Sequence, residues 1–134
     1  FGGNPVSCAA AKATINVIQR DELDKNAEEM GDILRKGLEQ LQEKYPKVIG
    51  EVRGMGLMQA IELVVDETKK DRTPNPAAAE QLMEETKARG LLIGRGGLYA
   101  NAMRISPPLN ITRSEVEEAL GILSDSFSAM DCIN

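Results

Sequence analysis

A long amphipathic helix is the feature that most limits how this chain can fold. Between Leu23 and Tyr45, apolar residues recur every three or four positions and charged residues occupy most of the others. Pro46 ends the pattern, because proline cannot continue helical hydrogen bonding. Gly31 and Gly37 lie inside this helix, and each costs about 1 kcal/mol relative to alanine. We therefore expect one face of the helix to pack on a core whose contacts offset that cost.

A second helix is predicted near the start of the chain. Asn4 followed by Pro5 is a strong helix start, since the asparagine side chain accepts hydrogen bonds from free amides and proline fits the first helical position. The helix should run to about Arg20. Its first turns are lined with alanine and serine, which predicts close packing, either on the rest of this chain or on a surface outside it.

The rest of the chain alternates between strand and helix patterns. We expect strands at residues 49–53, 57–64, 91–93 and 102–106, a surface loop at 66–76, a glycine turn at 94–97, and helices at 77–89 and from Thr112 onward. Thr112 and Glu115 have the spacing of a capping box. This order predicts an α+β fold, with a small, mostly antiparallel sheet covered by helices on one face.

Composition excludes several classes of function. The chain has 134 residues, which suits one domain or part of a larger one, and a formal charge of −5, which argues against nucleic acid or an anionic membrane as partner. It has no histidine, which excludes Ser-His-Asp and Cys-His nucleophile pairs. Cys8 and Cys132 lack metal-binding spacing, so we expect no metal site and an intracellular, reducing location. No apolar run reaches membrane-spanning length.

Few residues suggest chemistry by themselves. Arg104 lies near the end of the strand predicted at 102–106, two residues before Ser106 and the two prolines, where a guanidinium can point toward a ligand and bind a carboxylate through two hydrogen bonds. The alternative for Arg104, and for Arg53, is a structural salt bridge. Glu62 is interpreted as the outward side chain of a strand covered on one face. The glycines at 94–97 are interpreted as a turn rather than a nucleotide site, and no catalytic residue is assigned.

Three motifs together resemble one family. They are the segments 1–5 (FGGNP), 53–58 (RGMGLM) and 104–109 (RISPPL), supported by the glycine-rich segment 94–99 (GRGGLY). Their order and spacing resemble the C-terminal part of the class III, pyridoxal-phosphate-dependent aminotransferases of fold type I. That family includes the 4-aminobutyrate, ornithine and alanine–glyoxylate type 2 enzymes. Segment 94–99 favours the alanine–glyoxylate-like branch.

The resemblance implies a division of the chain and a site. Residues 1–20 would form a helix joining the cofactor domain to a small α+β domain at 21–134, within a homodimer. Arg104 falls where the family binds the substrate carboxylate, and Phe1 and Gly2 fall at a loop that reaches the phosphate of pyridoxal 5'-phosphate in the neighbouring subunit. The Schiff-base lysine and its large domain would lie before Phe1. We therefore expect amino-group transfer from an amino acid or ω-amino acid to a 2-oxo acid in the parent, and none by this chain alone.

Two other functions remain open at this stage. The chain could be a free-standing module that binds an amino or keto acid through Arg104, or a dimerisation domain without catalysis. The first residue is Phe rather than Met, which favours the enzyme hypothesis. The amino donor and acceptor, and a cytoplasmic or mitochondrial location, do not follow from these residues.

Overall fold

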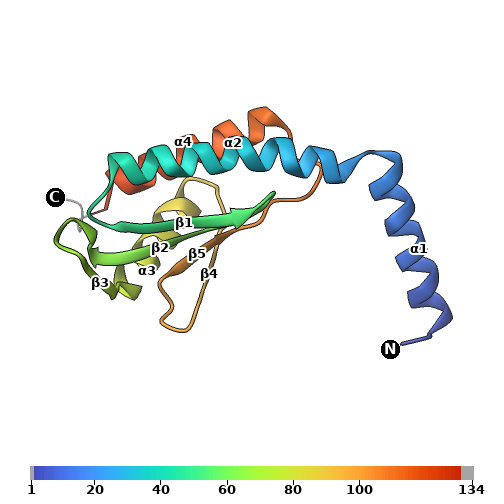
Figure 1. Cartoon of the computed structure of the whole chain (residues 1–134), viewed down its shortest axis with the longest axis horizontal. Coiled ribbons are helices and arrows are strands. Elements are labelled where there is room, and N and C mark those ends of the chain that lie inside the picture. The colour runs from blue at the N-terminus through green and yellow to red at the C-terminus, as the bar shows by residue number, and fades with distance from the viewer. Residues whose placement is uncertain (1, 131–134) are drawn as a thin grey trace.

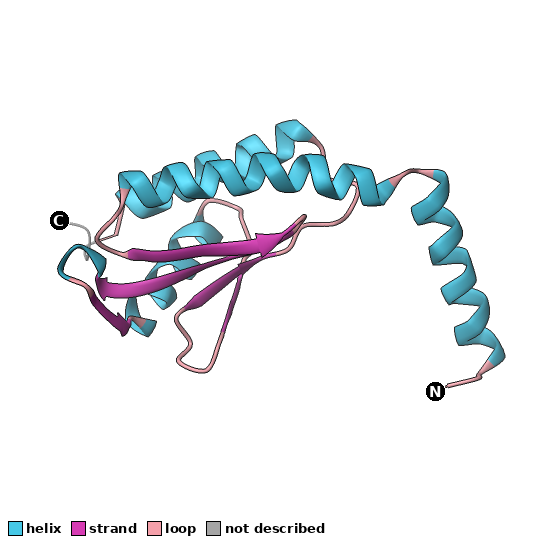
Figure 2. Cartoon of the chain, viewed as in Figure 1, coloured by secondary structure: helices cyan, strands magenta, loops and turns pink. Residues whose placement is uncertain are grey.

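The computed structural model describes residues 2–130, in which a layer of helices lies against a small sheet. Figures 1 and 2 show the arrangement. The helices are α1 (Pro5–Arg20), α2 (Leu23–Lys44), α3 (Pro76–Ala88) and α4 (Arg113–Ser128), with a short 3-10 turn, η1 (Glu67–Lys69). The strands are β1 (Ile49–Met55), β2 (Met58–Asp66), β3 (Asp71–Pro74), β4 (Gly94–Gly96) and β5 (Ala102–Ile105).

The sheet is antiparallel throughout the described residues, in the order β1-β2-β5-β4. β3 pairs with the last residues of β2, beyond the part of β2 that pairs with β5. Val52, Ile61 and Met103 stand opposite one another on β1, β2 and β5, and all three are buried. Because side chains alternate between the two faces of a strand, this row marks the face that the helices cover.

The core forms between that face and the helices. α2 buries Leu34, Leu38 and Leu41, as its stripe predicts, and α4 lies beside it with Leu123 and Phe127 completely buried. The Phe127 ring stacks on Tyr45 with centroids 5.2 Å apart. The predicted α+β class, with helices on one face of a small antiparallel sheet, is confirmed.

The helix ends follow the predicted capping chemistry. The Asn4 side chain accepts hydrogen bonds from the amides of Val6 and Ser7, 2.9 and 3.3 Å away. At the start of α4, Thr112 and Glu115 form the capping box in both directions. These local contacts need no tertiary partner, which explains why the sequence predicts them well.

Three predicted segments differ from the structure. Residues 66–76 are not a plain loop, because they contain η1 and the short edge strand β3. The strand expected at 91–93 and the turn expected at 94–97 are also displaced. The strand is Gly94–Gly96, and the chain turns at residues 97–100. Glycine disfavours strands intrinsically, so pairing with β5 is what makes residues 94–96 a strand.

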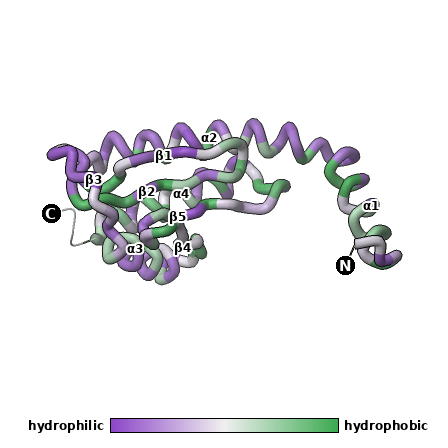
Figure 3. The backbone as a smooth tube through the Cα atoms, turned by 60° about the horizontal axis from the view of Figure 1, so that its bottom comes forward, coloured by the Kyte–Doolittle hydropathy of each residue, from purple (hydrophilic) through white to green (hydrophobic). Residues whose placement is uncertain are grey.

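Helix α1 stands apart from the other elements. It extends from one end of α2 and buries none of its residues, although Val6, Ile15 and Val17 are apolar and exposed. Figure 3 shows hydrophobic positions on this separate arm. The packing surface that its small residues predict is therefore not supplied by residues 21–130.

Candidate functional site

The uncovered face of the sheet carries two adjacent rows of side chains, and we call it the open face. One row is Arg53, Ala60, Arg104 and Gly94, which stand opposite one another on β1, β2, β5 and β4. The next row is Glu51, Glu62, Ala102 and Gly96 on the same four strands. Two arginines thus share the open face, separated by one alanine on the strand between them.

Arg104 differs from the other arginines. Within residues 2–130, each of the seven others has a carboxylate partner in an ion pair, whereas Arg104 has none. Its immediate neighbours across the strands are Ala60 and Gly94. A Cβ atom at Gly94 would lie 3.2 Å from an Arg104 Nη atom, so the guanidinium lies over this glycine. Small neighbours therefore leave an exposed cation without a protein partner.

Arg53 is held by two acids. Its guanidinium donates to Glu62 Oε1 at 2.6 Å and to Glu51 Oε2 at 3.2 Å. The hydrogen bond to Glu62 is the main reason that the pKa of Arg53 is raised above its ordinary value. The salt-bridge interpretation is therefore confirmed for Arg53, and Glu62 is an open-face side chain as predicted.

A shallow hollow of about 250 Å³ lies between the two arginines on the open face. It is lined by Arg53, Gly54, Met58, Gln59, Ala60, Arg104 and Ser106. Arg53 is already neutralised at this site, so Arg104 provides its available positive charge. A guanidinium presents two parallel donors that match a carboxylate, and the hollow is suited to bind a small acid.

The hairpin that forms one wall of this hollow is fixed to α2. At the turn, Gln59 Nε2 donates to the Gly56 carbonyl at 2.7 Å, and Arg35 of α2 donates to the Gly54 carbonyl at 3.3 Å. Gly31 of α2 touches the backbone of Gly56 so closely that a Cβ would lie 2.3 Å from its carbonyl carbon. The RGMGLM segment is thus a tight turn pressed onto a helix.

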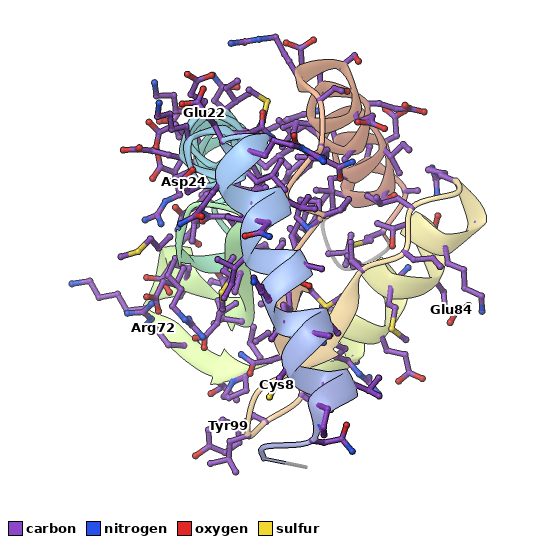
Figure 4. The ribbon with its side chains drawn as sticks, turned by 90° about the vertical axis from the view of Figure 1, so that its right-hand side faces the viewer. Cys8, Glu22, Asp24, Arg72, Glu84 and Tyr99 are labelled. Carbon is purple, nitrogen blue, oxygen red and sulfur yellow. The ribbon has the colours of Figure 1, made fainter. Side chains whose placement is uncertain are left out.

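The other predicted site residues lie elsewhere. Phe1 is outside the described residues, and Gly2 is exposed just before α1. Figure 1 shows α1 as an arm at one end of the molecule, and Figure 4 views the molecule from that end, with α1 in front and Cys8 labelled on it. Within this chain, Gly2 and Arg104 therefore do not form one site. Cys8 is exposed and unpaired in the described part of the chain, and Cys132 lies outside that part.

Other parts of residues 2–130 offer less chemistry. A hollow of about 380 Å³ between α2, α4 and the segment after β5 is mostly apolar and has no cationic side chain in its lining. No group of three or more potential metal ligands comes together within these residues. Their helices also lack the combination of length and apolar character needed to cross a bilayer.

Comparison with known proteins identifies the family. The family model described as "Aminotransferase class-III" matches residues 1–127. The chain belongs to the class-III aminotransferases. The mitochondrial alanine–glyoxylate aminotransferase 2 homolog 2 of Arabidopsis thaliana is 42% identical over 130 residues, covering 97% of this chain and 27% of the plant protein.

Solved structures of similar sequence contain the same fold. A phospholyase from Arthrobacter, in complex with phosphoethanolamine, matches with a TM-score of 0.86 and 35% identity, over 96% of this chain and 30% of that one. A PLP-bound amine transaminase from an uncultivated Pseudomonas species matches with a TM-score of 0.82 and 37% identity, over 94% and 28%. This class-III chain therefore spans less than a third of the length of these relatives.

The sequence predicts a ligand-binding role for Arg104, but it does not predict the surroundings of this residue. Ala60 and Gly94 carry no chemical signal in the sequence, and their part in the site follows from strand register alone. Arg53 and Arg104 are 51 positions apart in the chain, and both stand opposite Ala60 on the strand between them. The motif order was a usable signal for the family, but the row of small residues around Arg104 was not.

Proposed function

We propose that this chain is the small C-terminal part of a pyridoxal-phosphate-dependent aminotransferase, in which Arg104 binds the carboxylate of the amino acid or 2-oxo acid substrate. The parent would move an amino group from an amino acid or ω-amino acid to a 2-oxo acid. Its class-III family and its similarity to an alanine–glyoxylate aminotransferase support this reaction.

The observation that carries the proposal is that Arg104 has no carboxylate partner within residues 2–130. Arg53, on the same face, pairs with both acids of the adjacent row, Glu51 and Glu62. Arg104 instead faces Ala60 and Gly94 beside a hollow of about 250 Å³. A bound carboxylate would supply the missing partner through two charge-assisted hydrogen bonds.

The described residues do not fit the cofactor by themselves. Pyridoxal phosphate supplies the electron sink of a transamination, and it needs a Schiff-base lysine and an acidic or basic partner for its ring nitrogen. The hollow beside Arg104 has no lysine in its lining. We propose that the parent's larger domain holds the cofactor, that Phe1 and Gly2 approach the cofactor phosphate of a neighbouring subunit, and that this chain alone is inactive.

The proposed division of the chain agrees with the position of α1. Residues 1–20 would connect the cofactor domain to the domain at 21–134, and the exposed apolar side chains of α1 would pack on the parent's larger domain or partner subunit in a homodimer. An intracellular location is supported by the mitochondrial label of the Arabidopsis relative.

A carboxylate-binding or dimerisation module without catalysis is the second candidate. The observation that favours it is the absence of a lysine from the described site, next to a cation that is free to bind an acid. A lyase reaction is a further outcome to test, because one relative is a phospholyase. An open reading frame upstream that contains a lysine-bearing cofactor domain would support the enzyme.

Replacement of Arg104 in the parent enzyme tests the proposal. Arg104→Lys keeps the charge but loses the planar fork, so we expect KM for the carboxylate substrate to rise about tenfold or more with a smaller effect on kcat. Arg113→Lys is the matched control, since Arg113 lies exposed on α4 and pairs with Glu117. Unchanged kinetics in Arg104→Lys would remove this residue from the site, and a lyase product without amino transfer would exclude the aminotransferase.

A further inference from the structure

Glu62 occupies a special position between the two arginines of the open face. It stands on β2, one row from Ala60, whose neighbours on either side are Arg53 on β1 and Arg104 on β5. Glu62 is therefore diagonal to both arginines. Diagonal neighbours in a sheet lie about 7–8 Å apart, within reach of long side chains. By register alone, this carboxylate can pair with either arginine.

The structure shows which arginine it selects. Glu62 Oε1 accepts a hydrogen bond from Arg53 at 2.6 Å, while Arg104 turns toward β4 and lies over Gly94. Both side chains of the Arg53–Glu62 pair are partly exposed, 43% and 32%, so the pair is in competition with water and with other charges. Ala60 separates the two arginines and has no polar group that could direct Glu62.

We propose that Arg53 is a positioning residue, which holds Glu62 away from Arg104 and so keeps Arg104 available for a substrate carboxylate. This inference rests on the proposed carboxylate-binding role of Arg104. Without Arg53, Glu62 would act as an internal carboxylate that competes with substrate for the same guanidinium. Glu51 also pairs with Arg53, but it lies on β1, two strands from Arg104, and cannot compete in this way.

A set of variants in the parent enzyme tests the inference. Arg53→Met should raise KM for the carboxylate substrate, and the inhibition constant of acetate, by about two- to sixfold, as expected for competition by an exposed ion pair. The effect on kcat should be small. Arg53→Lys should raise both constants less than Arg53→Met does, because a lysine still offers Glu62 a cation.

The decisive variants are two double substitutions. Arg53→Met with Glu62→Gln should return both constants to wild type, since the neutral amide no longer competes for Arg104. Arg53→Met with Glu51→Gln is the matched control. Its KM and its inhibition constant for acetate should stay as high as those of Arg53→Met alone. Where Arg104→Lys raises KM, an Arg53→Met variant without effect, or a Glu62→Gln substitution without rescue, would show that the positioning role is wrong.

A structural readout separates this inference from the proposed function. A crystal structure of the Arg53→Met enzyme should show Glu62 paired with Arg104, and a Glu62 carboxylate that stays away from Arg104 would overturn the inference. If that pair forms while Arg104→Lys leaves KM unchanged, the carboxylate-binding role fails and Arg53 still controls the partner of Arg104. If Arg104→Lys raises KM and the pair does not form, the positioning role alone fails.

Discussion

Asp66 shows how one residue couples the fold to pH. This buried residue ends β2, where its carboxylate accepts a hydrogen bond from the Thr68 hydroxyl and pairs with Lys69 at 3.0 Å. These contacts, led by the Thr68 hydrogen bond, lower the pKa of Asp66 to about 2. Because the folded pKa is below the unfolded value of about 3.9, the contribution to stability is complete above about pH 5 and is lost as pH falls toward 2.

Asp66→Asn tests this coupling. The variant should be less stable than the wild-type chain near pH 7. The difference in the free energy of unfolding should shrink between about pH 5 and pH 2, as the wild-type carboxylate becomes protonated. Urea unfolding at several pH values measures it. Asp125→Asn is the control, because the Asp125 side chain makes no hydrogen bond or ion pair within residues 2–130. A difference that stays constant across this pH range would contradict the prediction.

Single residues differ in how far the sequence predicts their roles. Asn4 and Thr112 act on amides two or three positions away, so their capping is visible in the sequence. Arg104 was predicted to bind the carboxylate of a ligand, from its position before two prolines and from the family motif. Its lack of a partner could not be predicted, because that depends on Ala60 and Gly94, which only strand pairing brings beside it.

At the scale of elements, a close contact between α2 and the β1–β2 hairpin lies next to the site. Gly31 in α2 meets the backbone of Gly56, which adopts a positive φ of 50° at the turn. The positive φ of Gly56 favours glycine at the turn, whereas Gly31 is not needed by its own helix and weakens it intrinsically. This contact offsets the cost of a glycine inside α2, as the sequence leads us to expect. It also holds one wall of the Arg104 hollow in place.

Gly31→Ala is expected to destabilise the chain by about 1–3 kcal/mol, despite the better helix propensity of alanine, because its Cβ would lie 2.3 Å from the Gly56 carbonyl carbon. Gly121→Ala in α4 is the matched control, since no atom lies within 4 Å of its added Cβ. The control should gain about 0.5–1 kcal/mol. Urea unfolding of both variants measures the difference, and a stabilised Gly31→Ala would show that the hairpin does not press on α2.

Helices and strands were predictable where the sequence pattern is long. The prediction failed where pairing with a neighbouring strand determines the structure of a segment. The 22-residue helix α2 repeats its apolar stripe over several turns, so its limits and buried face agree with the prediction. β4 consists of Gly94, Arg95 and Gly96 and carries no strand signal of its own. It is a strand because β5 offers an edge to pair with, and the same holds for the charged strand β3 beside β2.

At the scale of the whole molecule, two surfaces are not covered by any other part of residues 2–130. One is the apolar side of α1, which buries nothing, and the other is the open face with Arg104. A helix of 16 residues without tertiary packing is marginal in water. Both surfaces are explained if this chain completes a larger enzyme, to which it contributes a substrate-binding arginine but not the cofactor chemistry.

The isolated chain should therefore form no specific internal aldimine with pyridoxal phosphate. A Schiff-base lysine needs a desolvated site that lowers its pKa, whereas all eight lysines of this chain are exposed. Borohydride reduction followed by mass spectrometry should find only low labelling spread over several lysines, at the level given by an unfolded control of the same chain. Stoichiometric labelling of one lysine, or transfer of an amino group from alanine to 2-oxoglutarate, would show that residues 1–134 contain an active site of their own.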